Sequence, residues 1–257
     1  MTVEDYKNFI SEIKKKKMYD RTVDEVLLNN YPIVNKKEQC IYFIESSSEN
    51  FFKNVKYPHS VISMLRLFAD GDIPIPLEFN TAVIEGGKLI EIQSSTQRLT
   101  YFTYYPLFHL NDENIVDANK FINKFQFPLE KKWIQLAVEN FDQSYKSIDN
   151  NLSFLSLMIC LEALFNPGEY ELKYRISRNI AVFLGKYKNM DSKKIFTDIK
   201  DLYDKRSKIV HTGKNDVIDS NNLSTLRKYV RESIKKMIEL DENKDELLKE
   251  LNTYGFN

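Results

Sequence analysis

The chain has few of the residues and patterns that mark several large classes of protein. Its 257 residues include only two cysteines, Cys40 and Cys160, which lie far apart in apolar surroundings. We therefore expect two buried thiols in a reducing compartment, and neither a disulfide nor a metal site. The sequence contains no C-x-x-C, no H-E-x-x-H and no acidic cluster with metal-ligand spacing. It thus predicts no metal and no other cofactor.

Long apolar runs and net charge are also missing. No stretch approaches the apolar length of about 20 residues that a membrane span needs. The first residues, MTVEDYKNFISEIKKKK, are amphipathic and lack the apolar centre of a signal peptide. We therefore expect a cytoplasmic protein with no membrane partner. The formal net charge is zero, so the molecule as a whole has no electrostatic preference for nucleic acid.

The charge that is present is unevenly spread. Residues 167–214 contain twelve Lys/Arg and six Asp/Glu. Such a basic segment can hold a phosphate backbone, or it can be a solvated helical surface that acidic neighbours balance. The four-lysine run at 14–17 leaves the same two interpretations open.

The first half of the chain has mixed patterns. Residues 3–18 and 61–69 favour helices, and residues 40–44 favour a strand. The apolar runs on either side of Gly86-Gly87 predict a β-hairpin, because this pair supplies the positive φ angles of a tight turn. Residues 99–110 are strand-like and aromatic, which fits a sheet core or a base-stacking surface. We expect residues 1–127 to form a mixed α/β domain, a possible sensor or regulator.

After Pro128 the pattern is helical almost throughout. We expect helices at 131–147, 152–165, 169–185, 191–210 and 219–240, followed by an acidic, partly helical tail. Residues 152–165 are apolar on nearly every side, which predicts a buried central helix. The predicted fold class is α+β, with a domain at 1–127 and a helical bundle at 128–257.

Glu162 is the only charged residue on the apolar segment 152–165. A lone carboxylate in such surroundings needs a partner, and Arg175, Arg178 and Arg206 are the candidates. One interpretation is a structural ion pair that fixes the register of the bundle. The other is that Glu162 orients an arginine that binds phosphate, and the two are compatible.

Arg206 lies on the apolar face of the segment 191–210, and His211 follows five residues later. If the helix stops near Val210, His211 can turn back towards Arg206 or a partner chain. If the helix continues, the two side chains lie about 140° apart. A simpler interpretation is that His211 only favours the negative end of the helix dipole.

An arginine can hold a phosphodiester, and an imidazole can exchange a proton near neutrality. RNA supplies its own nucleophile in the 2′-hydroxyl. The pair is therefore sufficient for metal-free RNA cleavage that leaves a 2′,3′-cyclic phosphate. One histidine serves poorly as both base and acid, so we expect two copies across a dimer to complete the site.

Residues 131–240 resemble the HEPN superfamily, in particular its ApeA-like branch. The resemblance rests on 161–165 (LEALF), on Arg175 and Arg178 with Ala181, and on 202–211 (LYDKRSKIVH). It implies a dimerising helical bundle with a composite ribonuclease site made of Arg206 and His211. Glu162, Arg175, Arg178, Ser207 and Lys208 are the expected supporting or RNA-binding residues. Such proteins often act in prokaryotic antiphage defence or as toxins.

Two positions depart from the family pattern. Ser207 stands where active members often have Asn, Asp or His. Gly213 stands where toxins silenced by a nucleotidyltransferase usually carry tyrosine, which argues against that form of control.

Three functions remain open from the sequence. The first is a metal-independent endoribonuclease, with the N-terminal domain recognising an unknown trigger. The second is a catalytically silent module for dimerisation or for binding RNA or a nucleotide. The third is a purely structural protein in which Arg206 and Glu162 form a buried ion pair.

Overall fold

The computed structural model describes residues 62–71, 73, 77–84, 88–96, 108, 109, 111–124, 129–147, 149–168, 170–212 and 218–254. The chain divides into two compact units. One comprises residues 1–58 and 74–103, and the other comprises residues 59–73 and 104–257. The predicted boundary near residue 128 does not coincide with this division, because residues 59–73 and 104–127 belong to the unit that contains the helices.

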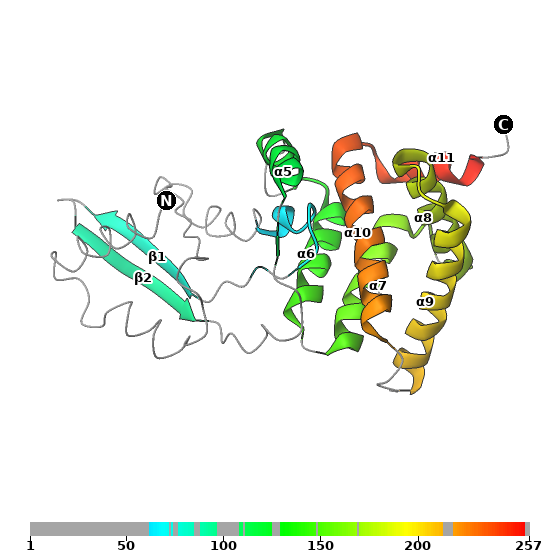
Figure 1. The fold of residues 1–257 in the computed structure, drawn as a ribbon, viewed down its shortest axis with the longest axis horizontal. Helices are drawn as coiled ribbons and strands as arrows, with labels where there is room; N and C mark the ends of the chain where they lie inside the picture. Colours follow the sequence, from blue (N-terminus) through cyan, green and yellow to red (C-terminus); the bar gives the residue numbers. More distant parts are fainter. Residues whose placement is uncertain are drawn as a thin grey trace. The chain divides into compact units, whose positions relative to one another are not determined.

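Two antiparallel strands are described in the first unit, β1 (Leu77–Ile84) and β2 (Lys88–Thr96) (Figure 1). Their register pairs Ile84 with Lys88 and Leu77 with Thr96. The Gly86-Gly87 turn lies outside the described residues, so the hairpin that we predicted around it stays a prediction. The predicted elements at 3–18, 40–44 and most of 99–110 also lie outside them.

The second unit is a helical bundle (Figure 1). Its helices are α5 (Asp112–Lys124), α6 (Lys132–Lys146), α7 (Asn150–Phe165), α8 (Leu172–Lys188), α9 (Ser192–Thr212), α10 (Ser220–Leu240) and α11 (Lys244–Thr253). The α+β class that we predicted is wrong for the described part of the chain, which is predominantly a helical bundle. The physical reason is that its hydrophobic core consists of helical side chains, with a few such as Met64 and Ile218 from adjoining segments.

Local signals explain where several of these helices begin and end. Asp149 caps α7 by accepting hydrogen bonds from the backbone N–H groups of Asn151 and Leu152, at 2.6 and 3.3 Å. Helix α8 continues past Gly185, where we expected it to stop, and ends at Asn189 in the left-handed conformation. Gly185 instead allows α9 to approach, because a Cβ there would collide with Ser192 Oγ.

Helix α7 packs against α6, α8, α9 and α10, and most of its side chains are buried. Cys160 is a fully buried free thiol, as predicted, and burial raises its pKa well above the usual value; Cys40 lies outside the described residues. The predicted buried central helix is thus confirmed, but two large apolar side chains on one side of it stay exposed. Leu152 is 57% exposed and Ile159 is 44% exposed, because no other described helix covers this side of α7.

A cluster of charged and aromatic groups connects the segment before β1 to the bundle. Arg66 pairs with Asp142 of α6 and donates a hydrogen bond of 3.1 Å to the carbonyl of Ile73. The guanidinium groups of Arg66 and Arg227 lie 5.1 and 4.3 Å from the ring centroid of Tyr145. We call Arg66, Asp142, Tyr145 and Arg227 the sealed cluster, since all four side chains are buried.

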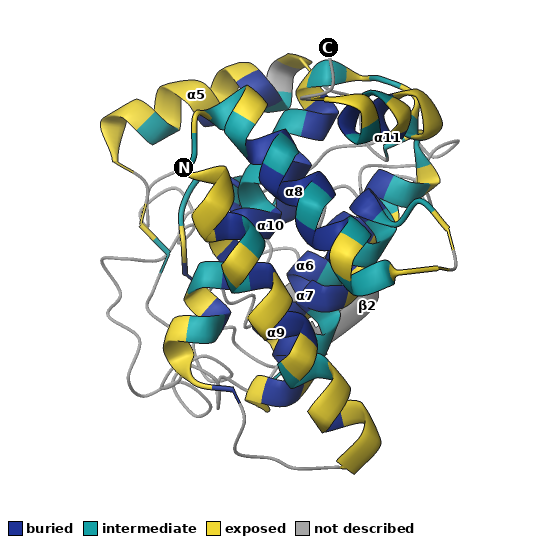
Figure 2. Cartoon of the chain, turned by 90° about the vertical axis from the view of Figure 1, so that its right-hand side faces the viewer, coloured by how far each residue is buried: buried dark blue, intermediate teal, exposed yellow. Residues whose placement is uncertain are grey.

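Burial follows the helix faces (Figure 2). Buried residues gather where the helices face one another, and the outer sides of α5 and α9 are exposed. Within the described residues, none of the helices has the length and apolar content to cross a membrane.

Candidate functional site

Helix α9 carries the residues on which the functional hypothesis depends. Its inner face is apolar and buried, as its spacing predicts, with Ile195, Ile199, Leu202, Tyr203 and Ile209 packed inward. Arg206 lies at the border of this face, and 34% of its side chain remains exposed. The sequence pattern placed the arginine in an apolar seam, but the structure leaves it in contact with solvent.

Glu162 of α7 meets two side chains of α9. Its Oε1 accepts a hydrogen bond of 3.0 Å from the hydroxyl of Tyr203 and lies 3.5 Å from Nη2 of Arg206. Of the three arginines considered as partners of Glu162, the structure therefore selects Arg206. We call Glu162, Tyr203 and Arg206 the open cluster, because the carboxylate and the guanidinium are both partly exposed.

The electrostatics of the open cluster keep Glu162 oriented. Burial, followed by the neighbouring Glu162 carboxylate, raises the pKa of Tyr203 to about 12. The hydroxyl therefore keeps its proton at neutral pH and remains a donor to Glu162. Among the described residues the Arg206 side chain makes its ion pair with Glu162 and no hydrogen bond. A guanidinium has five N–H donors, and those of Arg206 that face solvent are available to an anion.

His211 lies in the last turn of α9, on the exposed side. The helix continues through it to Thr212, so of our two alternatives the continuing helix is the one observed. His211 is therefore rotated by about 140° from Arg206 and displaced along the axis by about 7.5 Å. It makes no hydrogen bond or ion pair with any residue that the structure describes. One chain alone does not bring the two side chains together.

The arginines of α8 do not reach the open cluster. The guanidinium of Arg178 donates hydrogen bonds to the carbonyls of Leu251, Asn252 and Tyr254, at 2.6, 3.2 and 3.1 Å. It thus satisfies the free carbonyl groups at the end of α11. Arg175 precedes it by three residues and lies on the same side of α8, about 60° away. The structure therefore gives Arg178 a structural contact, and among the described residues neither arginine forms an ion pair with Glu162.

Ser207 and Lys208 are exposed on α9. Ser207 lies on the face of the helix that carries His211, about 40° from it. The carbonyl of Lys208 accepts a hydrogen bond of 2.6 Å from the Thr212 hydroxyl, which stabilises the last turn. Both residues are thus closer in helical phase to His211 than to Arg206.

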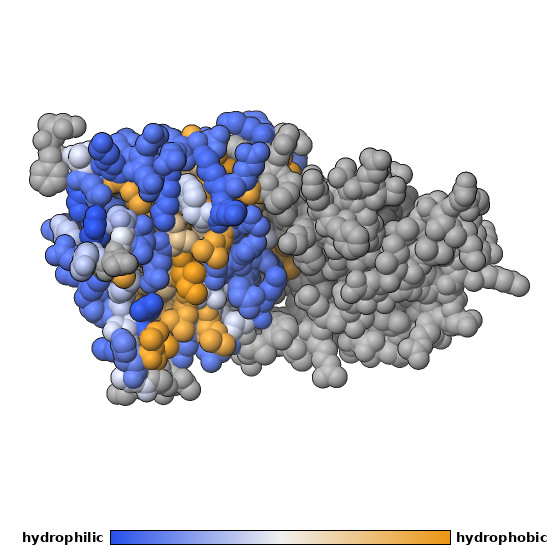
Figure 3. Space-filling model, turned by 180° about the vertical axis from the view of Figure 1, so that it is seen from behind, coloured by the Kyte–Doolittle hydropathy of each residue, from blue (hydrophilic) through white to orange (hydrophobic). Residues whose placement is uncertain are grey.

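An exposed apolar strip runs beside the open cluster, and sequence reasoning missed it. It comprises Leu136 of α6, Leu152 and Ile159 of α7, and Val210 of α9. Figure 3 shows hydrophobic side chains gathered on one face of the bundle. Ile159 precedes Glu162 by one helical turn, and Val210 follows Arg206 by one turn. The strip therefore borders the side of the bundle on which Arg206 is exposed.

Sequence reasoning also missed the role of Tyr203, although a signal was present. Tyr203 precedes Arg206 by three residues, so both lie on one side of a helix. A phenol beside a predicted ion pair is a natural third partner, since a buried hydroxyl needs an acceptor. The contact itself joins residues that are 41 positions apart, and the sequence does not specify that distance.

No group of three or more His, Cys, Asp or Glu side chains that could hold a metal ion occurs in the described part of the chain. No family model matches the chain, and no curated protein or solved structure matches it significantly.

Proposed function

We propose that this chain is a metal-independent endoribonuclease of the HEPN type, acting as a cytoplasmic homodimer in prokaryotic antiphage defence or as a toxin. The observation that carries the proposal is the open cluster. A partly exposed Arg206 is oriented by Glu162 of α7, and α9 carries both this arginine and an exposed His211 without a described partner. The helical bundle formed by residues 132–240 also agrees with the resemblance to that superfamily.

The two side chains divide the reaction between them. Arg206 binds the non-bridging oxygens of a phosphodiester and stabilises the charge that develops there. His211 removes the proton of the neighbouring 2′-hydroxyl, and the 2′-oxygen attacks the phosphorus. The bond to the 5′-oxygen breaks, and a second imidazole protonates that leaving oxygen. The products are a 2′,3′-cyclic phosphate and a 5′-hydroxyl.

A second copy of the chain supplies what one copy lacks. In one chain Arg206 and His211 lie on different sides of α9. Leu152 and Ile159 are exposed on α7, and an exposed apolar surface is typical of a protein interface. A homodimer that covers this strip would place His211 of the partner subunit near Arg206.

A second candidate is a catalytically silent HEPN module for dimerisation or for binding RNA or a nucleotide. The observation that favours it is the pairing of Arg206 with Glu162, which occupies part of the guanidinium. Ser207 after the arginine favours the same candidate. This protein would dimerise through the same strip and bind RNA without cleaving it.

Cleavage in the presence of EDTA tests the proposal. Wild-type protein should cleave single-stranded RNA and leave 2′,3′-cyclic phosphate ends, and His211→Ala should abolish the activity. Lys228→Ala, an exposed change on α10, is the matched control and should cleave as wild type does. Cleavage that survives in His211→Ala would overturn the assignment. RNA binding without cleavage by wild type would favour the silent module.

Mixing wild type with an inactive variant tests the composite site. If one site uses the imidazoles of both subunits, only dimers of two wild-type subunits are active. Random mixing with an equal amount of His211→Ala should then halve the activity per wild-type subunit, since half of those subunits form mixed dimers. If each site lies within one chain, the activity per wild-type subunit stays unchanged. Leu152→Ser with Ile159→Ser should convert the dimer to a monomer in sedimentation.

A further inference from the structure

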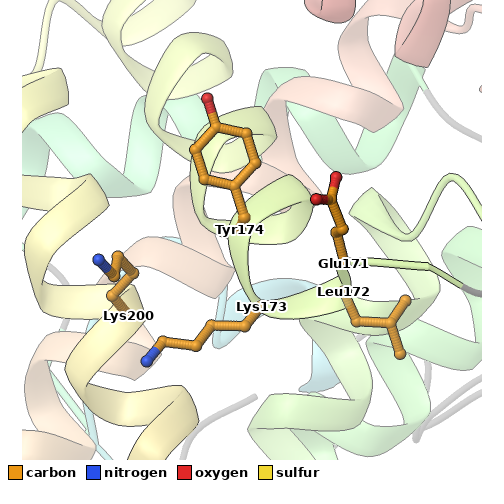
Figure 4. A pocket seen from close by; sticks show the side chains of 5 residues that line it. All are labelled: Glu171, Leu172, Lys173, Tyr174 and Lys200. Atoms are coloured by element: carbon orange, nitrogen blue, oxygen red, sulfur yellow. The ribbon is translucent and has the colours of Figure 1, made fainter.

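A shallow hollow of about 450 Å³ lies where α8 begins, against the middle of α9. Its lining consists of Glu171, Leu172, Lys173 and Tyr174 from the start of α8 and Lys200 from α9 (Figure 4). The hollow does not include Arg206, His211 or the apolar strip. The function proposed above therefore leaves its composition unexplained.

Tyr174 presents an aromatic ring to this hollow. Its ring packs edge-to-face on Phe196 of α9, with centroids 5.9 Å apart and an interplanar angle of 80°. This contact fixes the ring, yet the residue remains 54% exposed. A fixed, exposed ring is a suitable surface for a nucleobase, since every base can stack on an aromatic side chain.

Lys200 supplies an available positive charge on the other side of the hollow (Figure 4). Its Nζ lies 5.5 Å from the ring centroid of Phe196, and no carboxylate pairs with it among the residues that the structure describes. Lys173, by contrast, is held by both carboxylate oxygens of Asp204, each at 2.6 Å. Lys200 is thus the lysine of the hollow that can bind a phosphate.

Glu171 favours one orientation of a nucleotide in the hollow. Its backbone has a φ of 54°, in the left-handed region that few residues other than glycine adopt. Strain of this kind persists where the surrounding structure holds it, and it is enriched at ligand sites. The carboxylate repels a phosphate and accepts hydrogen bonds from N–H groups of a base. A bound nucleotide would therefore direct its base towards Tyr174 and Glu171 and its phosphate towards Lys200.

The hollow and His211 share one face of α9. Lys200, Ser207 and His211 lie within about 40° of one another around the helix, whereas Arg206 is rotated away. Asp204 stands between them on this face, and its pairing with Lys173 neutralises its charge. Lys200 and His211 are separated by about 16 Å along the axis. That distance corresponds to about five stacked nucleotides.

We propose that this hollow binds one nucleotide of a single-stranded RNA that runs along α9 to His211, with its base stacked on Tyr174 and its phosphate on Lys200. The inference rests on the proposed function for its substrate class. It adds a binding site outside the reacting residues, which holds the strand on the side of α9 that carries the histidine.

Binding of a strand that cannot be cleaved tests this site separately from catalysis. The probe is a fluorescein-labelled 2′-O-methyl oligoadenylate of about eight residues, within the usual range of single-strand sites, and the readout is fluorescence anisotropy with the full chain. Tyr174→Ala should weaken binding on the order of tenfold, and Tyr174→Phe should keep most of it. Tyr254→Ala is the matched control, because Tyr254 is 48% exposed but lies outside the hollow.

The salt dependence of the same binding tests Lys200. Lys200→Ala should reduce the slope of log affinity against log salt by about 0.7, the value for one phosphate contact on a single strand. Lys228→Ala, an exposed lysine of α10, should leave the slope unchanged. Far-ultraviolet circular dichroism establishes that each variant is folded.

The outcomes separate the hollow from the ribonuclease proposal. If wild type does not bind the probe, or if Tyr174→Ala and Tyr254→Ala bind it equally well, the inference about the hollow is overturned. If the probe binds through Tyr174 and Lys200 but unmodified RNA is not cleaved, the hollow stands and the ribonuclease proposal fails. If Tyr174→Ala cleaves limiting RNA as fast as wild type does, the inference about the hollow is overturned and the ribonuclease proposal stands.

Discussion

Two arginine clusters in the helical bundle differ in how far solvent reaches them. In the sealed cluster Arg66 is 3% exposed and pairs with Asp142. In the open cluster a third of the Arg206 side chain is exposed, and its nearest Glu162 oxygen is 3.5 Å away. Both clusters join a tyrosine, a carboxylate and an arginine. Only the open cluster leaves guanidinium N–H groups available to a ligand.

The difference separates a structural role from a functional one. When one partner of a buried ion pair is removed, the free energy of unfolding falls by several kcal/mol, because neither water nor another charge compensates the charge that remains. An exposed pair contributes little to stability, since water solvates each charge when the other is removed. We therefore expect the sealed cluster to determine stability and the open cluster to determine activity. The predictions that follow test this distinction.

The largest expected effect is on the sealed cluster. Asp142→Ala leaves Arg66 buried beside Tyr145 without its carboxylate, and it should lower the free energy of unfolding by about 3–5 kcal/mol. Denaturant unfolding followed by circular dichroism measures the change. The matched control is Lys146→Ala, which removes the exposed partner of the same carboxylate and should cost less than about 1 kcal/mol. Equal losses in the two variants would contradict a sealed cluster.

Arg206→Ala should change stability little and RNA cleavage strongly. The free energy of unfolding should change by less than about 1 kcal/mol, because the pair with Glu162 is partly exposed. The rate of RNA cleavage should fall by about 10²–10³, the usual effect of removing one group that stabilises transition-state charge. Thermal unfolding and single-turnover cleavage on one protein preparation check both parts. A strongly destabilised variant would show that Arg206 has a structural role, as Arg66 does.

Alkaline pH should weaken the sealed cluster through Tyr145. Burial is the main reason that the pKa of Tyr145 is raised to about 12 in the folded chain, against about 10 when unfolded. The folded state therefore holds this proton more tightly, and its stabilisation is present below pH 10 and lost as the pH rises towards 12. The difference between these two pKa values corresponds to about 2–3 kcal/mol of folding stability.

Tyr145→Phe isolates this contribution. The variant should lose about 1–2 kcal/mol at pH 8, because the phenol no longer contacts Asp70 and Arg231. Between pH 9 and pH 11.5 its free energy of unfolding should fall less steeply than that of wild type. Guanidinium unfolding at several pH values measures both slopes. Parallel slopes would show that another group causes the alkaline loss.

The smallest expected effect concerns the tyrosine of the open cluster. Tyr203→Phe removes one hydrogen bond to Glu162 and should cost about 1 kcal/mol of stability. Tyr203 acts by positioning Glu162 and, through it, Arg206, so kcat should fall several-fold while KM for RNA changes little. Glu162→Gln is the companion variant, because it keeps an acceptor for Tyr203 but removes the charge that faces Arg206. A change confined to KM would contradict a positioning role.

The order and approximate limits of the bundle helices could be predicted from the sequence. Apolar spacing, capping residues such as Asp149, and breaks near Pro167 are local signals that act over a few residues. The end of α8 that we predicted at Gly185 was wrong. Glycine marks many helix ends, but here it serves the close approach of α9.

The candidate site was less predictable. Arg206, His211 and Glu162 stand out by residue type and spacing, but the pairing of Glu162 with Arg206 was one of three possibilities. Arg178 shows why the choice needs a structure. It is as well placed in sequence as Arg206, yet it binds the carbonyls at the end of α11, 73–76 residues away.

The sequence by itself determined which segments of the bundle are helical, which residue types lie on α9, and the spacing of Arg206 and His211. These are properties of neighbouring residues on one helix, so the helical repeat fixes them. Only the tertiary structure decided that Glu162 meets Arg206, that Leu152 and Ile159 stay exposed, and that Tyr174 and Lys200 line one hollow. Each of these depends on which helices pack side by side, and that arrangement follows from burial of the whole core.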